Sequence, residues 1–265
     1  MVSSGHAAPA FVGLAAHPLR WRLLTELATS DHRVRELVDL LGQPQNLISY
    51  HLRLLRTGGL VNARRSSFDA RDSYYHLDLQ RCADALSAAG TVLHPALGLD
   101  PAPPPLRAAQ QADQSSVLFA CTGNSARSPI AEALLRRAGH RQVTSAGSHP
   151  KPAVHPHAVR VLRERHGVDI ADQRPRHLDT LGRRRFDYVI TLCDKVREVC
   201  PDFPDHPRLI HWSIPDPAAA TSGGAGTASH ATDLGAFVDV AAEIETRIRY
   251  LLPTLARVPR QEARP

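Results

Sequence analysis

A cysteine and an arginine separated by five small or polar residues are the strongest chemical feature of the sequence. Cys121 follows an apolar run, 117–120, and Arg127 precedes an apolar-periodic helix that opens near Ser128. The backbone N–H groups of such a strand–loop–helix junction can bind an anion, and the helix start favours the thiolate form of a nearby cysteine. The planar fork of an arginine matches two oxygens of a tetrahedral oxyanion. The pattern predicts nucleophilic attack by Cys121 on a phosphate-like group.

The residues between and just after this pair form the predicted oxyanion-binding set. A buried structural cysteine beside a chance arginine is the alternative, and the strand before and the helix start after make it the weaker one. The set comprises Thr122, Gly123, Asn124, Ser125, Ala126, Arg127 and Ser128.

Two further thiols follow a second apolar strand. Cys193 comes directly after 186–192, as Cys121 does after its own strand, so both should open on the same edge of a parallel sheet. In one regular helix Cys193 and Cys200 would stand roughly 10 Å apart, too far for a disulfide. Pro201 disfavours helical geometry at Cys200, so this segment can loosen. The three thiols predict a relay of thiol–disulfide exchange, and the alternative is that Cys193 and Cys200 are buried fillers.

Asp216 is the remaining candidate for chemistry. The oxygen that leaves a transferred oxyanion needs a proton, and a carboxylic acid on a loop above the anion could supply it. Asp216 is followed by Pro217, and Asp-Pro is also a common turn dipeptide, so spacing alone leaves both interpretations open.

Strands and helices alternate in the second half of the chain, which predicts an α/β domain of three layers around a parallel four-stranded sheet. The expected strands are 117–120, 142–147, 186–192 and 209–212, and the expected helices are 130–138, 156–166 and 235–252. We expect a Gly/Ala/Ser tract at 221–229 to be a surface loop.

The first part of the chain predicts a winged helix-turn-helix, mostly α with a β-hairpin wing. Apolar periodicity indicates helices at 14–28, 34–41 and 45–56, and two strands at 60–65 and 73–77 form the hairpin. Residues 40–68 hold four arginines and no acidic residue, a bias that suits approach to phosphates. A small helical interaction module with a solvated polar face is the alternative. The predicted DNA-binding residues are Gln45, Asn46, Ser49, Tyr50, His51, Arg53, Arg64 and Arg65.

Composition divides the 265 residues into a DNA-binding domain at 1–90, a Pro-rich linker at 91–116 and a catalytic domain at 117–265. The net charge is +6, and only Lys151 and Lys195 are lysines among the 32 basic residues, so the overall charge is weak evidence for nucleic-acid binding and the local placement of the arginines has to decide. No apolar run approaches the roughly 20 residues of a membrane span, and the N-terminus lacks a signal-peptide pattern. Four cysteines are too few for a disulfide scaffold, and we expect a cytoplasmic protein with no membrane partner.

Residues 11–80 resemble the arsenic-responsive repressor family of winged-helix regulators. The resemblance is carried by Leu14 to Leu24, by Glu36 to Leu60 and by the Tyr74-Tyr75 pair. It implies a homodimer formed through the N-terminal domain, which binds a palindromic operator in double-stranded DNA as a repressor and releases it when inducer arrives. Many arsenite-sensing members carry two cysteines at the start of the second helix, where this chain has Arg33 to Leu37. Its lone Cys82 cannot make a three-thiolate arsenite site, so the resemblance assigns neither the inducer nor the residues that sense it.

Residues 117–256 resemble the low-molecular-weight tyrosine phosphatase fold and, within it, the thioredoxin-coupled arsenate reductases. The fold is carried by 121–132 and 145–147, and the reductase by 189–193 with Cys200-Pro201 and by His211-Trp212 with Asp216-Pro217. The resemblance implies reduction of arsenate to arsenite by Cys121, Arg127, Asp216, Cys193 and Cys200. It implies a redox-active disulfide, a thioredoxin-like dithiol reductant, and no bound cofactor.

This second resemblance has three departures. Ala126 replaces a cysteine often found inside the reductase loop, and Ser128-Pro129 is the phosphatase-like sequence. Some reductases bind a potassium ion, and Asn124, Glu132 and Ser145 match its ligands, but 174–177 lacks the carboxylate that completes the site.

The sequence therefore favours an arsenic-type repressor fused to an arsenate reductase. Two alternatives remain: a protein-tyrosine phosphatase fused to a repressor, and a regulator whose catalytically silent second domain binds an oxyanion or arsenite.

Overall fold

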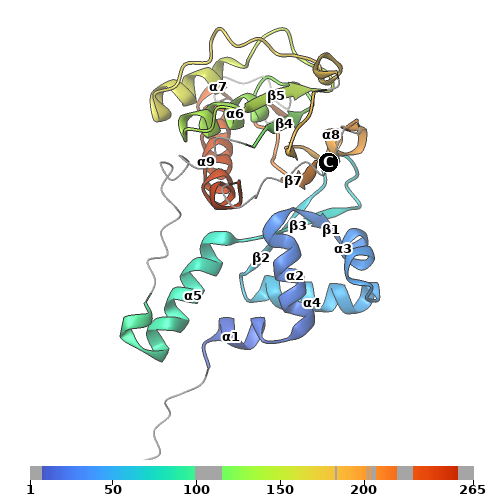
Figure 1. Ribbon diagram of the computed structural model, residues 1–265, viewed down its shortest axis with the longest axis vertical. Coiled ribbons are helices and arrows are strands. Elements are labelled where there is room, and N and C mark those ends of the chain that lie inside the picture. Colours follow the sequence, from blue (N-terminus) through green and yellow to red (C-terminus); the bar gives the residue numbers. More distant parts are fainter. Residues whose placement is uncertain are drawn as a thin grey trace, which may run out of the picture. The chain divides into compact units, whose positions relative to one another are not determined.

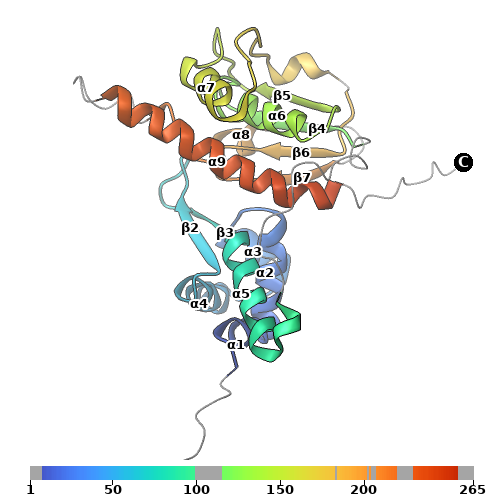
Figure 2. The same cartoon turned by 90° about the vertical axis from the view of Figure 1, so that its left-hand side faces the viewer.

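The computed structural model describes residues 8–98, 115–182, 184–201, 203, 207–219 and 229–255. The chain divides into two compact units, Met1–Pro103 and Pro104–Pro265 (Figures 1 and 2). The division falls within the predicted linker, of which residues 99–114 lie outside the described residues, as does most of the predicted 221–229 loop.

The first unit is a winged helix-turn-helix. Its three short strands form an antiparallel sheet in the order β1-β3-β2. The elements, in chain order, are α1 (Ala10–Ala15), α2 (Pro18–Thr29), β1 (His32–Arg33), α3 (Val34–Leu41), α4 (Gln45–Thr57), β2 (Val61–Arg65), β3 (Ser73–Leu77), α5 (Leu79–Leu93) and the 3₁₀ turn η1 (Pro95–Leu97). The predicted helices and hairpin are present, whereas α1 and β1 were not foreseen.

Local signals fix the turn between α3 and α4. A capping box starts α3, with the Glu36 carboxylate accepting from the Arg33 backbone N–H at 2.8 Å. Gly42 ends α3 at φ 63°, a left-handed conformation that suits glycine, and Pro44 precedes α4. Ile48, Leu52 and Leu55 of α4 are fully buried and pack in the core of the unit. The opposite face of α4 is thereby presented to solvent.

The helix α5 carries the first unit past the predicted boundary at residue 90. Asp78 caps it by accepting from the Arg81 N–H at 3.0 Å, and the helix runs to Leu93. Cys82 packs against the core, as expected of a lone thiol in an apolar helix. Burial, with a smaller contribution from Asp78, raises its pKa to about 11, so this thiol is a poor nucleophile at neutral pH.

The second unit has a parallel sheet in the order β5-β4-β6-β7. Its elements are β4 (Val117–Cys121), α6 (Arg127–Arg137), β5 (Val143–Gly147), α7 (Pro156–Val161), the π-helical turn η3 (Leu162–His166), the 3₁₀ turn η4 (Leu178–Leu181), β6 (Tyr188–Thr191), α8 (Asp194–Val199), β7 (Arg208–His211) and α9 (Ser229–Leu255).

Helices cover both faces of this sheet. In Figure 1, α6 and α9 lie on one side of the strands and α8 on the other, and Figure 2 shows α9 in front of the sheet. Every residue of β4 and β6 is buried, which explains why both strands are apolar runs without alternation. The predicted fold class is therefore confirmed for both units. None of the helices in the described ranges has the length and apolar character of a membrane span.

Candidate functional site

The carboxyl end of β4 and the first turn of α6 hold the residues 121–127, called here the oxyanion loop. Cys121 is the last residue of β4, Arg127 the first of α6, and both side chains are buried. The parallel register places Gly147 of β5 beside Cys121. This is the edge of a parallel sheet at which ligands bind in α/β folds.

The segment 148–155 orients the backbone of the oxyanion loop. Its N–H groups donate to the outward carbonyls of Thr122 at 2.9 Å, Gly123 at 2.8 Å and Ser125 at 2.8 Å. Within the described residues, the N–H groups of 122–126 make no hydrogen bond. Because the carbonyl oxygens of the loop are already hydrogen-bonded to the segment 148–155, its amide groups are left as possible donors to an oxyanion.

Gly147 leaves no room for a side chain beneath this loop. A Cβ atom there would lie 2.5 Å from the Thr122 carbonyl oxygen and 2.9 Å from the Asn124 backbone nitrogen. Both are backbone atoms, so the loop itself would have to move.

We expect Gly147→Ala to weaken phosphate binding by at least about tenfold, because displaced amides no longer converge on one oxyanion. Isothermal titration calorimetry with inorganic phosphate measures the effect. Gly235→Ala is the matched control, since a Cβ in that position of α9 meets nothing within 4 Å. Equal phosphate affinity in the two variants would contradict the prediction.

Asn124 is the conformational anchor of the loop. It has a φ of 43°, the one positive value among the described non-glycine residues. Its Oδ1 accepts from the Arg176 backbone N–H at 2.8 Å, and its Nδ2 donates to Ser128 Oγ and to Ser145 Oγ, both at 2.9 Å. The three contacts offset the cost of left-handed backbone.

Ser128 connects this anchor to the nucleophile. Its Oγ lies 3.0 Å from Cys121 Sγ and already accepts from Asn124. The Ser128 hydroxyl proton is therefore free to point at the sulfur.

Arg127 and Asp216 form an ion pair beside the loop. Arg127 donates from Nη1 to the Ile214 carbonyl at 3.1 Å and from Nη2 to Asp216 Oδ2 at 3.0 Å. The Asp216 side chain is 44% exposed, whereas that of Arg127 is 7% exposed. The pair thus places the Asp216 carboxyl group at the solvent side of the buried guanidinium.

Cys193 lies two residues beyond the end of β6, and its side chain reaches the oxyanion loop. Its Sγ is 3.2 Å from the hydroxyl oxygen of Thr122, the residue that follows Cys121. Burial raises the pKa of this thiol, and Cys121 adds to the rise, whereas Arg127 and the Thr122 hydroxyl lower it less than burial raises it. The structure thus brings two of the three predicted thiols to one edge of the sheet.

Cys200 stands at the far end of α8. Cys193 precedes the first residue of this helix and Cys200 follows its last, with φ −64° and ψ 125°. The extended conformation before Pro201 agrees with the expectation from the sequence. The helix between them holds the Cα atoms of Cys193 and Cys200 roughly 10 Å apart, whereas a disulfide needs them within about 7 Å, so a bond between these two thiols requires α8 to unwind.

A buried polar cluster next to Cys193 was not foreseen as a unit. His211 of β7 has its Nδ1 2.8 Å from Thr191 Oγ1 and its Nε2 3.1 Å from Asp194 Oδ1. All three residues are buried. Asp194 begins α8, so the contact fixes the start of the helix that separates the two thiols.

The residues that match potassium ligands do not fit a cation in this chain. Gln173 points its side-chain nitrogen at Glu132 Oε2, at 2.9 Å, and at Ser145 Oγ, at 3.4 Å. Ser145 also accepts from Asn124. N–H donors therefore stand where a cation needs free oxygen lone pairs. Elsewhere in the described part of the chain, no three His, Cys, Asp or Glu side chains are grouped to hold a metal.

In the first unit, most of the predicted DNA-binding residues lie on the outer face of α4. Tyr50 is 47% exposed, and the Arg53 guanidinium lies 5.7 Å from the centre of its ring. Arg64 and Arg65 stand on β2 in the wing, with Arg65 donating to the Ala70 carbonyl at 2.9 Å. Gln45, Asn46 and Ser49 are also exposed.

His51 departs from the prediction that it contacts DNA. It is only 5% exposed, and its ring packs on that of His17 at 4.4 Å. Burial, followed by the nearby His17 and Arg20, lowers the pKa of His51, which favours a neutral interior histidine. The helical position adjacent to Tyr50 turns inward because α2 packs there.

Known proteins match the two units separately. The model of the low molecular weight phosphotyrosine protein phosphatase family matches residues 116–262, more than half of the chain, and that of the bacterial regulatory protein arsR family matches 17–63. The chain belongs to the low molecular weight phosphotyrosine protein phosphatase family. Its N-terminal unit is an arsR-family helix-turn-helix.

Relatives of this phosphatase-family chain include arsenate reductases. That of Brevibacillus brevis is 38% identical over 108 residues, covering 40% of this chain and 79% of the relative. That of Halalkalibacterium halodurans is 37% identical over 106 residues, covering 39% and 75%. Among solved structures, an arsenate reductase from Archaeoglobus fulgidus is 31% identical with a TM-score of 0.41, covering 52% of this chain and 99% of that chain. An arginine phosphatase from Geobacillus stearothermophilus is 27% identical with a TM-score of 0.42, covering 53% and 92%.

Proposed function

We propose that the second unit reduces arsenate to arsenite through a relay of Cys121, Cys193 and Cys200. The observation that carries the proposal is the pair of thiols at one edge of the sheet, linked by the contact of Cys193 with Thr122 in the oxyanion loop. Hydrolysis of a phosphoester needs one nucleophilic thiol, whereas reduction of a substrate needs two thiols to supply the electrons. The names of the related arsenate reductases support the same substrate.

In the first step the Cys121 thiolate attacks arsenate held by the loop amides and Arg127. A sulfur–arsenic bond forms, and one arsenate oxygen departs with a proton from Asp216. Arg127 already spans Asp216 and the Ile214 carbonyl, so the acid and the anion-binding group are held together before the substrate arrives.

In the second step Cys193 attacks Cys121 Sγ. A sulfur–sulfur bond forms, the sulfur–arsenic bond breaks, and its electron pair stays on arsenic, which leaves as arsenite. The two thiolates are thereby oxidised to a disulfide while As(V) is reduced to As(III). In the third step Cys200 displaces Cys121, α8 unwinds, and a thioredoxin-like dithiol reduces the resulting 193–200 disulfide.

The second step should accelerate with rising pH. Burial raises the pKa of Cys193, so its thiolate fraction below that pKa increases about tenfold per pH unit, and the rate of disulfide formation with it. Rapid-quench mass spectrometry from about pH 6 to about pH 9 measures this rate. Thr122→Val removes a hydrogen bond that lowers the pKa, which shifts the profile to higher pH. A flat profile would contradict the assignment.

A phosphatase is the second candidate. It is favoured by the family to which the chain belongs. The first step uses only Cys121, Arg127 and Asp216, and these residues would also serve the hydrolysis of a phosphoester. Purified protein assayed in parallel with arsenate plus a thioredoxin system and with an aryl phosphate separates the two. Turnover of arsenate supports the reductase, and turnover of the aryl phosphate alone supports the phosphatase. Turnover of neither, with loss of DNA binding when arsenite or arsenate is added, supports a sensor.

We propose that the first unit binds operator DNA through the outer face of α4 and the wing. The exposed Gln45, Asn46 and Ser49 side chains can read base edges, and Arg53, Arg64 and Arg65 can contact phosphates. A footprint on the DNA upstream of the gene, with and without arsenite, tests both the binding and its release.

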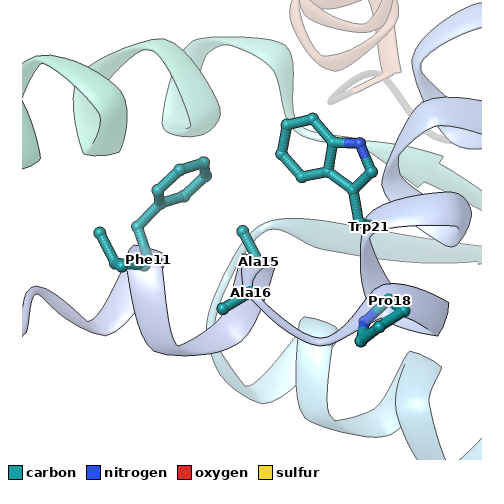
Figure 3. A pocket seen from close by; sticks show the side chains of 6 residues that line it. Phe11, Ala15, Ala16, Pro18 and Trp21 are labelled. Atoms are coloured by element: carbon teal, nitrogen blue, oxygen red, sulfur yellow. The ribbon is translucent and has the colours of Figure 1, made fainter.

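A homodimer formed through this unit agrees with its exposed apolar surface. No residue of the amphipathic α5 is buried, and Leu86, Val92 and Leu93 are each at least 48% exposed. Between α1 and α2 lies an apolar hollow of about 480 Å³, with Phe11 and Trp21 facing each other across it (Figure 3). A second copy of the unit would cover these faces, and the two α4 helices would then meet a palindromic site. Analytical ultracentrifugation measures the oligomeric state.

A further inference from the structure

Glu132 is a buried carboxylate that supports the oxyanion loop from below. It lies on α6 and is 5% exposed. Arg136 donates to its Oε1 from two nitrogens, at 2.9 and 3.1 Å. Its Oε2 accepts from Gln173 at 2.9 Å. A buried carboxylate is costly unless both oxygens are satisfied, so Gln173 supplies a necessary donor.

The same Gln173 nitrogen also contacts β5. It lies 3.4 Å from Ser145 Oγ on β5, and Ser145 accepts from Asn124 at 2.9 Å. Asn124 in turn contacts Ser128, which contacts Cys121 Sγ. The Gln173 amide group therefore bridges α6 and β5. A chain of hydrogen bonds through Ser145, Asn124 and Ser128 connects it to the Cys121 sulfur.

Gln173 is itself held in place by the segment that carries it. Its backbone N–H donates to Ile170, and three residues further on Arg176 both donates to Asn124 Oδ1 and accepts from Gly147. The segment 170–176 thus contacts the side chain of Asn124 in the oxyanion loop and the backbone of Gly147 in β5.

We propose that Gln173 is a positioning residue whose amide takes the place of a bound monovalent cation, so that the oxyanion loop is preset without an ion. A cation at this position would neutralise Glu132 and bridge the Ser145 oxygen. The Gln173 NH₂ group donates to both from a fixed position. The inference rests on the proposed role of the loop as an oxyanion site, but not on turnover of arsenate.

The test compares potassium, sodium and tetramethylammonium chlorides at equal ionic strength and pH 8 on the full chain. Scanning calorimetry measures the melting transitions in buffer without phosphate and in buffer with phosphate, and the transition of the second unit is identified as the one that Gln173→Glu shifts. Titration calorimetry measures phosphate affinity. We expect the wild-type melting temperature to differ by less than about 1 °C among the salts, with equal phosphate affinity.

Gln173→Glu places a second carboxylate against Glu132. We expect its melting temperature in tetramethylammonium to fall by about 5 °C or more, and potassium to restore at least half of that loss, because a cation must now bridge the two carboxylates. Gln80→Glu is the matched control, since Gln80 donates to Asp84 at 3.0 Å on an exposed helix surface. It should show no potassium-specific change.

A potassium-specific rise in the wild-type melting temperature or phosphate affinity would overturn the proposal, even if the Gln173 variant does not fold. A loss in Gln173→Glu that potassium does not reverse would also overturn it. Failure of the wild type to bind phosphate in every salt would instead refute the oxyanion site, while the phosphate-free melting temperatures would still test Gln173.

Discussion

Replacing Cys193 with serine is expected to lower multiple-turnover arsenate reduction by about 10³-fold or more, while one arsenate per chain still reacts with Cys121. A serine hydroxyl is a far weaker nucleophile toward sulfur than a thiol, so the second step stops. Thr122 and the amides of the oxyanion loop are unchanged, so the first step proceeds. Steady-state assays with a thioredoxin system give the turnover, and rapid-quench mass spectrometry counts the adduct.

Cys82→Ser is the matched control for this result, because Cys82 is the thiol in the other unit and packs against its core. It should retain full turnover. Hydrolysis of an aryl phosphate, which needs only the first-step residues, should be unaffected by Cys193→Ser. Sustained arsenate reduction by Cys193→Ser would refute the relay.

Arg127→Lys is expected to lower kcat/KM for arsenate by at least about 100-fold. The buried guanidinium holds the Ile214 carbonyl and Asp216 with two different nitrogens, which leaves its remaining N–H groups for the oxyanion. A single ammonium group cannot satisfy the carbonyl, the carboxylate and the substrate in that geometry, and an unpaired buried acceptor remains.

The control for this charge-conserving change lies on the same helix. Arg137 ends α6 with a 40% exposed side chain and pairs with Glu245 at 3.6 Å, so Arg137→Lys should leave kcat/KM unchanged. If Arg127→Lys stayed within about tenfold of the wild type, a bidentate role for Arg127 would be wrong.

The features that sequence could predict are those set by local chain geometry. The apolar strand, the Cys121–Arg127 spacing and the helix start occupy one continuous stretch, so their positions follow from the order of the residues. Cys193 could be placed at the same edge because parallel strands end together. The helix α8 itself was not predicted, but the extended backbone of Cys200 followed from the restriction that Pro201 imposes.

The features that sequence missed depend on contacts between distant segments. The register of β6 with β7 pairs Thr191 with His211, and no local pattern encodes that pairing. Gln173 lies in an irregular segment, and nothing in its neighbourhood indicates that it meets Glu132, 41 positions earlier. His51 was predicted to contact DNA because it follows Tyr50, whereas the packing of α2 on α4 turns it inward.

The six-residue helix α8 has a thiol at each end. In the proposed relay, joining those thiols breaks the helix and its contact between Asp194 and His211, so oxidation and local fold cannot change independently. A protein reductant would then meet an unwound segment only on spent enzyme. The conformation of residues 193–200 would therefore distinguish the oxidised chain from the reduced one, and the reductant would bind only chains that carry the disulfide.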